Sequence, residues 1–203
     1  MLANPVQLWP NAGKVGGLKL LCCASALPLA VRRGVLPDGA EPVTHGYTVP
    51  KAAEYMPFMR QLTVFCAPDV AVPDGPEHTL RPQNLLRDRD YGAWAGAGLQ
   101  ALDPALQHAF LTDTTFAPPE GESFAAAYHR AALWLDGISQ HLPAAVVLAR
   151  PAVVRNLLLK VLYQEENVVG LAHAARLDVP PLSYSLISYH AGKWRLGMLG
   201  APA

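Results

Sequence analysis

The sequence predicts an α/β protein, a three-layer α/β/α sandwich around a mainly parallel central sheet. Short apolar segments of strand length occur at residues 18–23, 62–67 and 144–149, and helical patterns alternate with them. This alternation favours parallel strands with helices on both faces of the sheet. A chain of 203 residues with 51% hydrophobic and 16% charged residues can form one well-packed domain. We therefore predict a single domain over residues 18–203, preceded by an extension over residues 1–17.

The first half of the chain contains two predicted strands. The segment "LKLLCC" is apolar except for Lys19, which is typical of a strand covered on both faces. A loop rich in proline and glycine is expected from there to about Pro42. A helix is expected to begin near Pro50, because proline suits a first helical turn. The second strand, "LTVFCA", precedes a long loop at residues 68–86, where Pro, Asp, Gly and Asn are dense.

The second half contains the clearest helix and a strand-turn-helix unit. A short helix is expected in "LDPALQHAFL", and a longer one follows Ser123, a favourable N-cap residue. "AAVVLA" is predicted to be a buried strand that leads directly into a helix with Pro151 in its first turn. The final segment "LSYSLISYHAGKWRLGML" predicts a hairpin with "HAGK" as its turn. The longer helix has one apolar face, formed by Phe124, Tyr128, Ala131, Leu135, Ile138 and Leu142.

Charge and cysteine content exclude several classes of function. Sixteen basic and sixteen acidic residues cancel, so neither nucleic acid nor an anionic membrane surface is expected as the main ligand. No segment approaches the roughly 18 consecutive apolar residues of a membrane span. Cys22, Cys23 and Cys66 form neither a disulfide framework nor a zinc motif. We expect reduced thiols, no metal, no cofactor and a cytoplasmic protein.

Several motifs resemble those of the histidine phosphatase superfamily, which includes phosphoglycerate mutases and α-ribazole phosphatase. "PPEGESFAAAYHR" and "AAVVLARPAVVRNLL" resemble the second half of such enzymes, where the strand usually ends in His-Gly-Gly-Val-Ile-Arg. "LLRDRDYGAWAG" resembles the family motif "L-x-E-x-D-F-G-x-W-E-G", and "LKLLCCASALPLAVRRGVLPD" resembles a first strand running into Arg-His-Ala-Pro-Thr. "GKWRLGMLG" fits the last strand. The motifs follow the family order over about residues 18–200 and imply a phosphoglycerate mutase-like fold.

The segment Leu18 to Gly34 also has the loose features of an export signal: basic residues, an apolar core and small residues near Ala24. The resemblance argues against that alternative. It makes this segment the first strand of the central sheet, which could not be cleaved away without destroying the core.

The resemblance also implies a catalytic site whose residues have been replaced. Such phosphatases attack phosphorus with an imidazole, bind the phosphoryl oxygens with arginines and a second histidine, and protonate the leaving oxygen with a carboxylic acid. The first arginine and the nucleophilic histidine correspond here to Ala24 and Ser25. The second arginine corresponds to Thr48 and the second histidine to Arg150. Only Asp88 keeps a carboxylate, so we expect the catalytic centre to be degenerate.

The leading hypothesis is therefore a pseudophosphatase, not an enzyme, that binds a small anion, a phosphorylated metabolite or a protein partner. Arg150 is the first candidate anion-binding residue, because a strand-to-helix turn lies beside free backbone N–H groups. Arg32 and Arg33 are further candidates. The alternative for each of these residues is a purely structural role. Arg32 and Arg33 are then solvated, and Ser25 fills space. Arg150 then pairs with a carboxylate such as Asp88 and closes the pocket.

Two other functions remain open. One is an active phosphomonoesterase with a rearranged site, in which Asp88 is the general acid and Ser25 a substitute nucleophile. "LPLAVRRGVLPD" resembles the motif "P-T-x-x-x-R-x-G-x-x-P" of the α-ribazole phosphatase branch. His45 and His78 are expected in loops near this pocket, where either could be recruited. The other is a structural interaction domain, a homodimer or partner-binding protein, that uses residues 1–17 as a docking arm.

Overall fold

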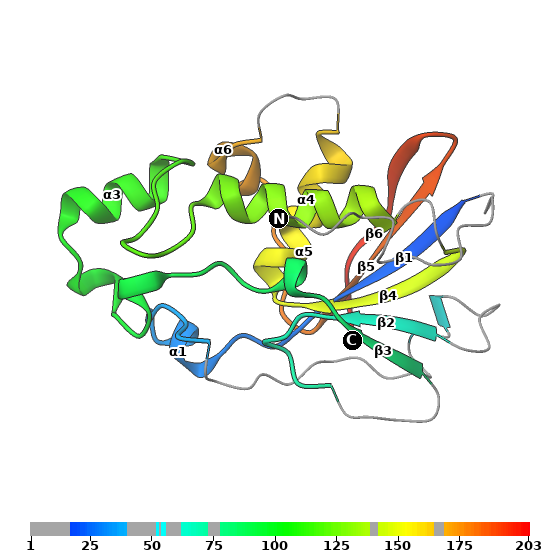
Figure 1. Ribbon diagram of the computed structural model, residues 1–203, viewed down its shortest axis with the longest axis horizontal. Coiled ribbons are helices and arrows are strands. Elements are labelled where there is room, and N and C mark those ends of the chain that lie inside the picture. Colours follow the sequence, from blue (N-terminus) through cyan, green and yellow to red (C-terminus); the bar gives the residue numbers. More distant parts are fainter. Residues whose placement is uncertain are drawn as a thin grey trace.

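Six β-strands form one sheet in the computed structural model, which describes residues 17–39, 52, 54–55, 62–72, 78–138, 142–164 and 169–203. The order across the sheet is β3-β2-β4-β1-β5-β6 (Figure 1). Strands β1 to β4 pair in parallel, whereas β5 pairs antiparallel with β1 and β6. The predicted mainly parallel sheet is confirmed. The strands are β1 (Leu18–Ala24), β2 (Leu62–Cys66), β3 (His78–Pro82), β4 (Ala144–Ala149), β5 (Ser183–His190) and β6 (Lys193–Pro202).

Helical segments cover both faces of this sheet. The ring of Phe65 packs against Trp134 of α4 (Phe124–Ile138), with ring centroids 5.5 Å apart. Across β4 and β1, Phe65 is in register with Ser185, so the neighbouring Tyr184 points to the opposite face. On that face the ring of Tyr184 packs against the ring of Tyr55, with centroids 5.5 Å apart. Tyr55 lies in a helical stretch. The predicted three layers are therefore confirmed.

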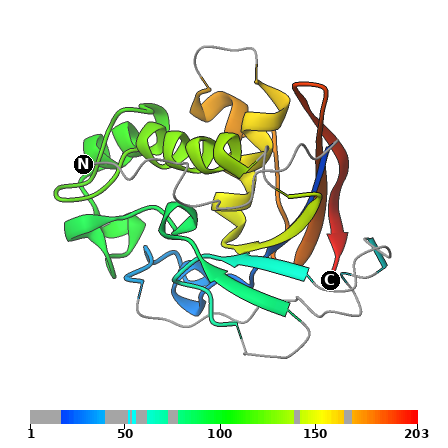
Figure 2. The ribbon, with the colours of Figure 1, turned by 45° about the vertical axis from the view of Figure 1, so that its right-hand side comes forward.

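The helices of the second half form as their sequence patterns predict. The Ser123 hydroxyl accepts a hydrogen bond from the Ala126 backbone N–H at 3.1 Å, so Ser123 caps α4. The predicted apolar stripe is buried from Phe124 to Ile138, whereas Leu142 lies beyond the end of α4 and is half-buried. Helix α5 (Pro151–Leu162) begins directly after β4 and packs beside α4 (Figure 2). The short α3 (Pro104–Thr112) is capped by Asp103, whose carboxylate accepts from two backbone N–H groups.

The C-terminal hairpin also has the predicted turn. Strands β5 and β6 are joined at Ala191 and Gly192, whose φ angles are +50° and +81°. Two successive residues with positive φ give the two-residue turn that matches the twist of antiparallel strands.

Two predicted loops contain regular structure. The segment after β1 contains a one-turn helix, α1 (Leu29–Arg32), and the loop predicted at residues 68–86 contains β3 and the 3-10 turn η2 (Asn84–Leu86). Strand β3 pairs only with β2, at the edge of the sheet, and its residues are half-buried or exposed. An edge strand of this kind needs no apolar run, which explains why the sequence pattern missed it. Of the helix predicted near Pro50, only Ala52, Glu54 and Tyr55 are described, and they are helical.

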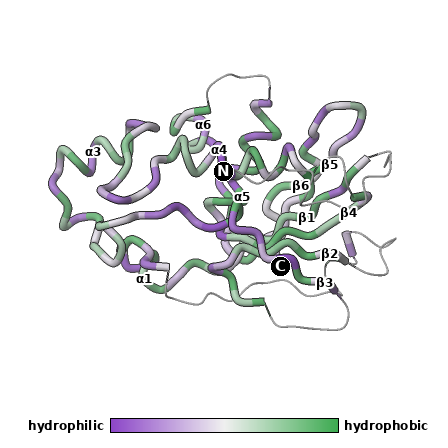
Figure 3. The backbone as a smooth tube through the Cα atoms, in the orientation of Figure 1, coloured by the Kyte–Doolittle hydropathy of each residue, from purple (hydrophilic) through white to green (hydrophobic). Residues whose placement is uncertain are grey.

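The most hydrophobic segments of the chain lie in the central sheet. In Figure 3 the interior strands are mainly hydrophobic, and β4 is completely buried. Among the described residues, no helix is long and apolar enough to cross a membrane. The remaining short elements are η3 (Gly92–Trp94), η4 (Leu99–Ala101) and α6 (Leu171–Ala174).

Candidate functional site

Three parallel strands end at the same edge of the sheet, and a cavity of about 330 Å³ lies there. Ser25 follows β1, Asp69 follows β2 and Arg150 follows β4. Ligands of open parallel sheets usually bind at this edge. We call this space the sheet-edge cavity. It is lined by Pro37, Asp38, Gly39, Pro68, Asp69, Arg87, Asp88, Arg89, Asp90, Tyr91, Ala95 and Arg150.

Arg150 is buried at this edge and forms an ion pair. It is the N-cap residue of α5 and is 2% exposed. Its Nε donates to Asp69 Oδ2 at 2.8 Å. A carboxylate partner was one of the two alternatives for this arginine, with Asp88 as the expected residue, but the structure places Asp69 there. The sequence analysis overlooked Asp69, although a carboxylate three residues beyond a parallel strand is a recognisable feature.

Ser25, which the sequence analysis aligns with the family's nucleophile, does not face the cavity. Ser25 is completely buried, and its hydroxyl donates to the carbonyl oxygen of Ala26 at 3.0 Å. The Ser25 backbone continues the sheet by pairing with Ala149 and Leu182. Neither Ser25 nor the buried Ala24 lines the sheet-edge cavity. Within the described part of the chain, the Ser25 side chain has no basic partner.

The other predicted site residues are not gathered here. Arg32 and Arg33 are exposed at the end of α1, and neither lines the cavity. His78 is the first residue of β3, at the amino end of a parallel strand, so the prediction that it lies in a loop near the pocket was wrong. Thr48 and His45 lie outside the described residues. In the described ranges, no histidine lines the cavity and no cluster of metal-binding side chains occurs.

Asp88 is in the cavity wall, as the resemblance implies. Its Oδ1 accepts a hydrogen bond from the Arg89 backbone N–H at 2.8 Å. Burial is the main cause that raises the pKa of Asp88 to about 6, and the negative charge of Asp69 adds to the rise. The hydrogen bond from the Arg89 N–H and the positive charges of Arg150 and Arg130 lower this pKa in part. A carboxyl group with such a pKa can release a proton near neutral pH, as a general acid must.

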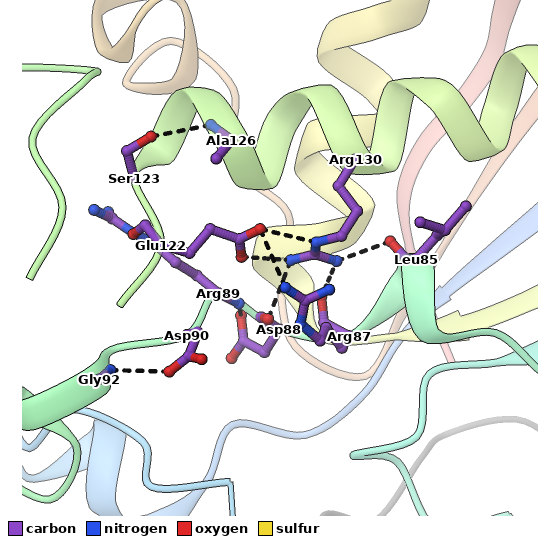
Figure 4. A network of polar contacts seen from close by, with 10 residues as sticks. All are labelled: Leu85, Arg87, Asp88, Arg89, Asp90, Gly92, Glu122, Ser123, Ala126 and Arg130. Carbon is purple, nitrogen blue, oxygen red and sulfur yellow. Dashed lines mark hydrogen bonds and ion pairs between the residues drawn. The ribbon is translucent and has the colours of Figure 1, made fainter. Parts of the chain in front are cut away.

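A largely buried arginine, Arg130, fixes the segment that carries Asp88 (Figure 4). Arg130 of α4 donates to both carboxylate oxygens of Glu122, at 3.0 and 2.7 Å. It also donates to the backbone carbonyls of Leu85, Arg87 and Asp88, at 2.8, 2.9 and 3.2 Å. The sequence analysis noted the "GES" motif that contains Glu122 but assigned this residue no role. Three of these hydrogen bonds hold residues 85–88 against α4, and the other two hold Glu122.

A second cavity, of about 220 Å³, shares part of its wall with the sheet-edge cavity. We call it the helix cavity, because α3, α4, α5 and α6 supply most of its wall. Asp88 and three of its neighbours separate the two cavities and line both. The residues of the helix cavity are Arg87, Asp88, Arg89, Tyr91, Phe110, Leu111, Phe124, Ala127, Arg130, Ala152, Val153, Arg155, Asn156 and Leu171.

Comparisons with known proteins agree with the fold. Residues 71–201 match the family described as the histidine phosphatase superfamily (branch 1). A mycobacterial hydrolase superposes with a TM-score of 0.66 and 17% identity, covering 92% of this chain and 100% of the other. A mycobacterial glucosyl-3-phosphoglycerate phosphatase superposes with a TM-score of 0.64 and 16% identity, covering 91% of this chain and 99% of the other. A candidate α-ribazole-5′-P phosphatase from Escherichia coli K-12 superposes with a TM-score of 0.65 and 15% identity, covering 92% of this chain and 98% of the other. A search of curated protein sequences found no significant match.

Proposed function

This chain belongs to the histidine phosphatase superfamily, and we propose that it is a catalytically degenerate member that binds a small anionic ligand without phosphoryl transfer. One observation carries the proposal: Ser25, which the resemblance aligns with the nucleophile, is buried and donates its hydroxyl to a backbone carbonyl. An unactivated serine is a weak nucleophile, and a hydroxyl turned away from the cavity cannot reach a phosphorus atom there.

The charges at the sheet edge also argue against phosphoryl transfer there. Four aspartates and three arginines line the sheet-edge cavity, and the charge of Arg150 is opposed by Asp69 at 2.8 Å. A phosphate dianion would meet the repulsion of these carboxylates at the position where the family binds its phosphoryl group. A ligand of lower charge fits better than a phosphorylated metabolite. We also propose a cytoplasmic location, where thiols stay reduced. Among the described residues, Cys22, Cys23 and Cys66 are free and buried.

The test is phosphate release by the full chain from p-nitrophenyl phosphate, α-ribazole 5′-phosphate and glucosyl-3-phosphoglycerate. We expect the native protein to release no more phosphate than a buffer blank, and Asp88→Asn to change nothing. The variant Ala24→Arg/Ser25→His/Thr48→Arg/Arg150→His restores the family residues and serves as the comparison for activity, with circular dichroism to verify its fold. Turnover by the native protein that collapses in Asp88→Asn overturns the proposal.

A second candidate is a phosphomonoesterase with a rearranged site. The raised pKa of Asp88, about 6, favours it, because the reaction needs an acid near neutral pH. The same assay separates the two candidates: the phosphomonoesterase requires turnover that depends on Asp88. The interaction-domain alternative predicts instead that removal of residues 1–17 abolishes partner binding.

A further inference from the structure

The helix cavity contains polar groups that the protein itself leaves without partners. Asn156 is 6% exposed, and its buried Oδ1 accepts no hydrogen bond. The buried Nε of the adjacent Arg155 donates none. Both residues lie in the first half of α5 and line the same cavity. Buried polar groups in folded proteins are nearly always paired, so a donor-acceptor pair of this kind indicates a ligand that completes it.

Arg155 is also an arginine of this cavity for which neither an ion pair nor a hydrogen bond from Nε occurs among the described residues. Four arginines and a single carboxylate, Asp88, line the wall. Arg130 is paired with Glu122, which also contacts Arg87 at 3.4 Å. Arg89 donates to backbone carbonyls and lies 4.4 Å from the centre of the Phe110 ring. No ion pair occurs for Arg155 within the described residues, so its charge is available to an anion.

Half of the residues that line this cavity are apolar, and its volume suits one ring. Cavities of about 150 Å³ bind benzene when their walls are apolar, and this one measures about 220 Å³. The additional volume accommodates two small polar substituents. The apolar side chains of the wall come from Phe110, Leu111, Phe124, Ala127, Ala152, Val153 and Leu171.

We propose that the helix cavity binds a small aromatic hydroxy acid. The carboxylate of the ligand accepts from the Arg155 guanidinium, its hydroxyl donates to Asn156 Oδ1, and its ring lies among the apolar side chains of α3, α4 and α6. This ligand class satisfies both unpaired groups and fills the apolar volume. Neither Arg155 nor Asn156 lines the sheet-edge cavity, and the inference holds whether or not the protein transfers phosphate.

Isothermal titration of the full chain with three matched probes tests the site. Mandelate carries the carboxylate, the hydroxyl and the ring; phenylacetate lacks the hydroxyl, and 1-phenyl-1,2-ethanediol lacks the carboxylate. We expect mandelate to bind about tenfold more tightly than phenylacetate, because phenylacetate leaves Asn156 Oδ1 unpaired. The diol is expected to bind at least tenfold more weakly than mandelate, because it loses the charge-assisted hydrogen bonds.

Variants assign the two contacts. Arg155→Met, which keeps the aliphatic stem, is expected to weaken mandelate binding at least tenfold. Arg195→Met, on an exposed residue of β6, is the matched control and should change nothing. Asn156→Leu is expected to abolish the preference for mandelate over phenylacetate, an effect that a merely structural role would not produce.

Several outcomes overturn the inference. No detectable binding of mandelate excludes this ligand class. Equal binding of all three probes shows a nonspecific apolar cavity, and an unchanged dissociation constant in Arg155→Met removes the proposed charge contact. Displacement of mandelate by inorganic phosphate identifies a general anion site instead. The phosphate-release assay decides the proposed function independently of these results.

Discussion

Removal of the Arg130 side chain tests whether the buried network in Figure 4 holds the cavity walls together. Arg130 and Glu122 are 10% and 12% exposed, so both charges of this pair lie largely out of water. Arg130→Met removes five hydrogen bonds and leaves Glu122 without its bidentate partner. The loss of one partner from a buried ion pair costs about 3–5 kcal/mol. We expect the free energy of unfolding to fall by that amount.

The assay is equilibrium urea denaturation of the parent and two variants, followed by circular dichroism. Lys160→Met is the matched control, because Lys160 of α5 pairs with Asp136 of α4 at 3.2 Å and Asp136 is 55% exposed. Exposed pairs contribute only about 0–1 kcal/mol. Arg130→Lys keeps the charge but loses the planar fork, so it should fall between the other two variants.

The result that refutes this reasoning is a loss in Arg130→Met below about 1 kcal/mol, no larger than the loss in the exposed-pair control. A small loss would mean that water solvates Glu122 and the three carbonyl groups once the arginine is gone. The segment that carries Asp88 would then be held by other contacts, and the wall between the two cavities would not depend on Arg130.

Two further predictions concern Asp88 and Gly92. Because burial raises the pKa of Asp88 to about 6 from 3.8, the stability due to its protonation is present below about pH 4 and is lost as the pH rises through 6. Asp88→Asn should therefore be about 1–3 kcal/mol more stable than the parent at pH 7 and gain little at pH 4 in urea titrations; a gain that does not change with pH contradicts this. Gly92→Ala should lose more than about 3 kcal/mol, because the new Cβ would lie 2.1 Å from the Pro119 carbonyl oxygen at a φ of +50°. Gly96→Ala, at a φ of +77° with no neighbour within 4 Å, should lose only about 1–2 kcal/mol in the same titration, and equal losses would refute the steric argument.

The candidate site was only partly predictable. The resemblance indicated Asp88 and Arg150, and both line the sheet-edge cavity. It did not indicate Asp69, which lies 81 positions from Arg150 along the chain. Arg155 and Asn156 are ordinary helix residues in the sequence, and only the packing of four helices makes them the wall of a cavity. His78 was expected in a loop near the pocket, and the strand that contains it places it elsewhere.

Local sequence patterns predicted the elements that depend on neighbouring residues. The apolar stripe of α4, the Ser123 cap, the Pro151 start of α5 and the positive-φ turn at Gly192 each depend on neighbours within a few residues. Contacts between polar side chains of distant segments, in contrast, depend on the fold. Ion pairs between distant residues depend on which strand ends share an edge, and an edge strand such as β3 is recognised only by its pairing with β2. The hydrophobic periodicity of the sequence predicts neither the ion pair nor the strand pairing, because both join segments that are not adjacent in the chain.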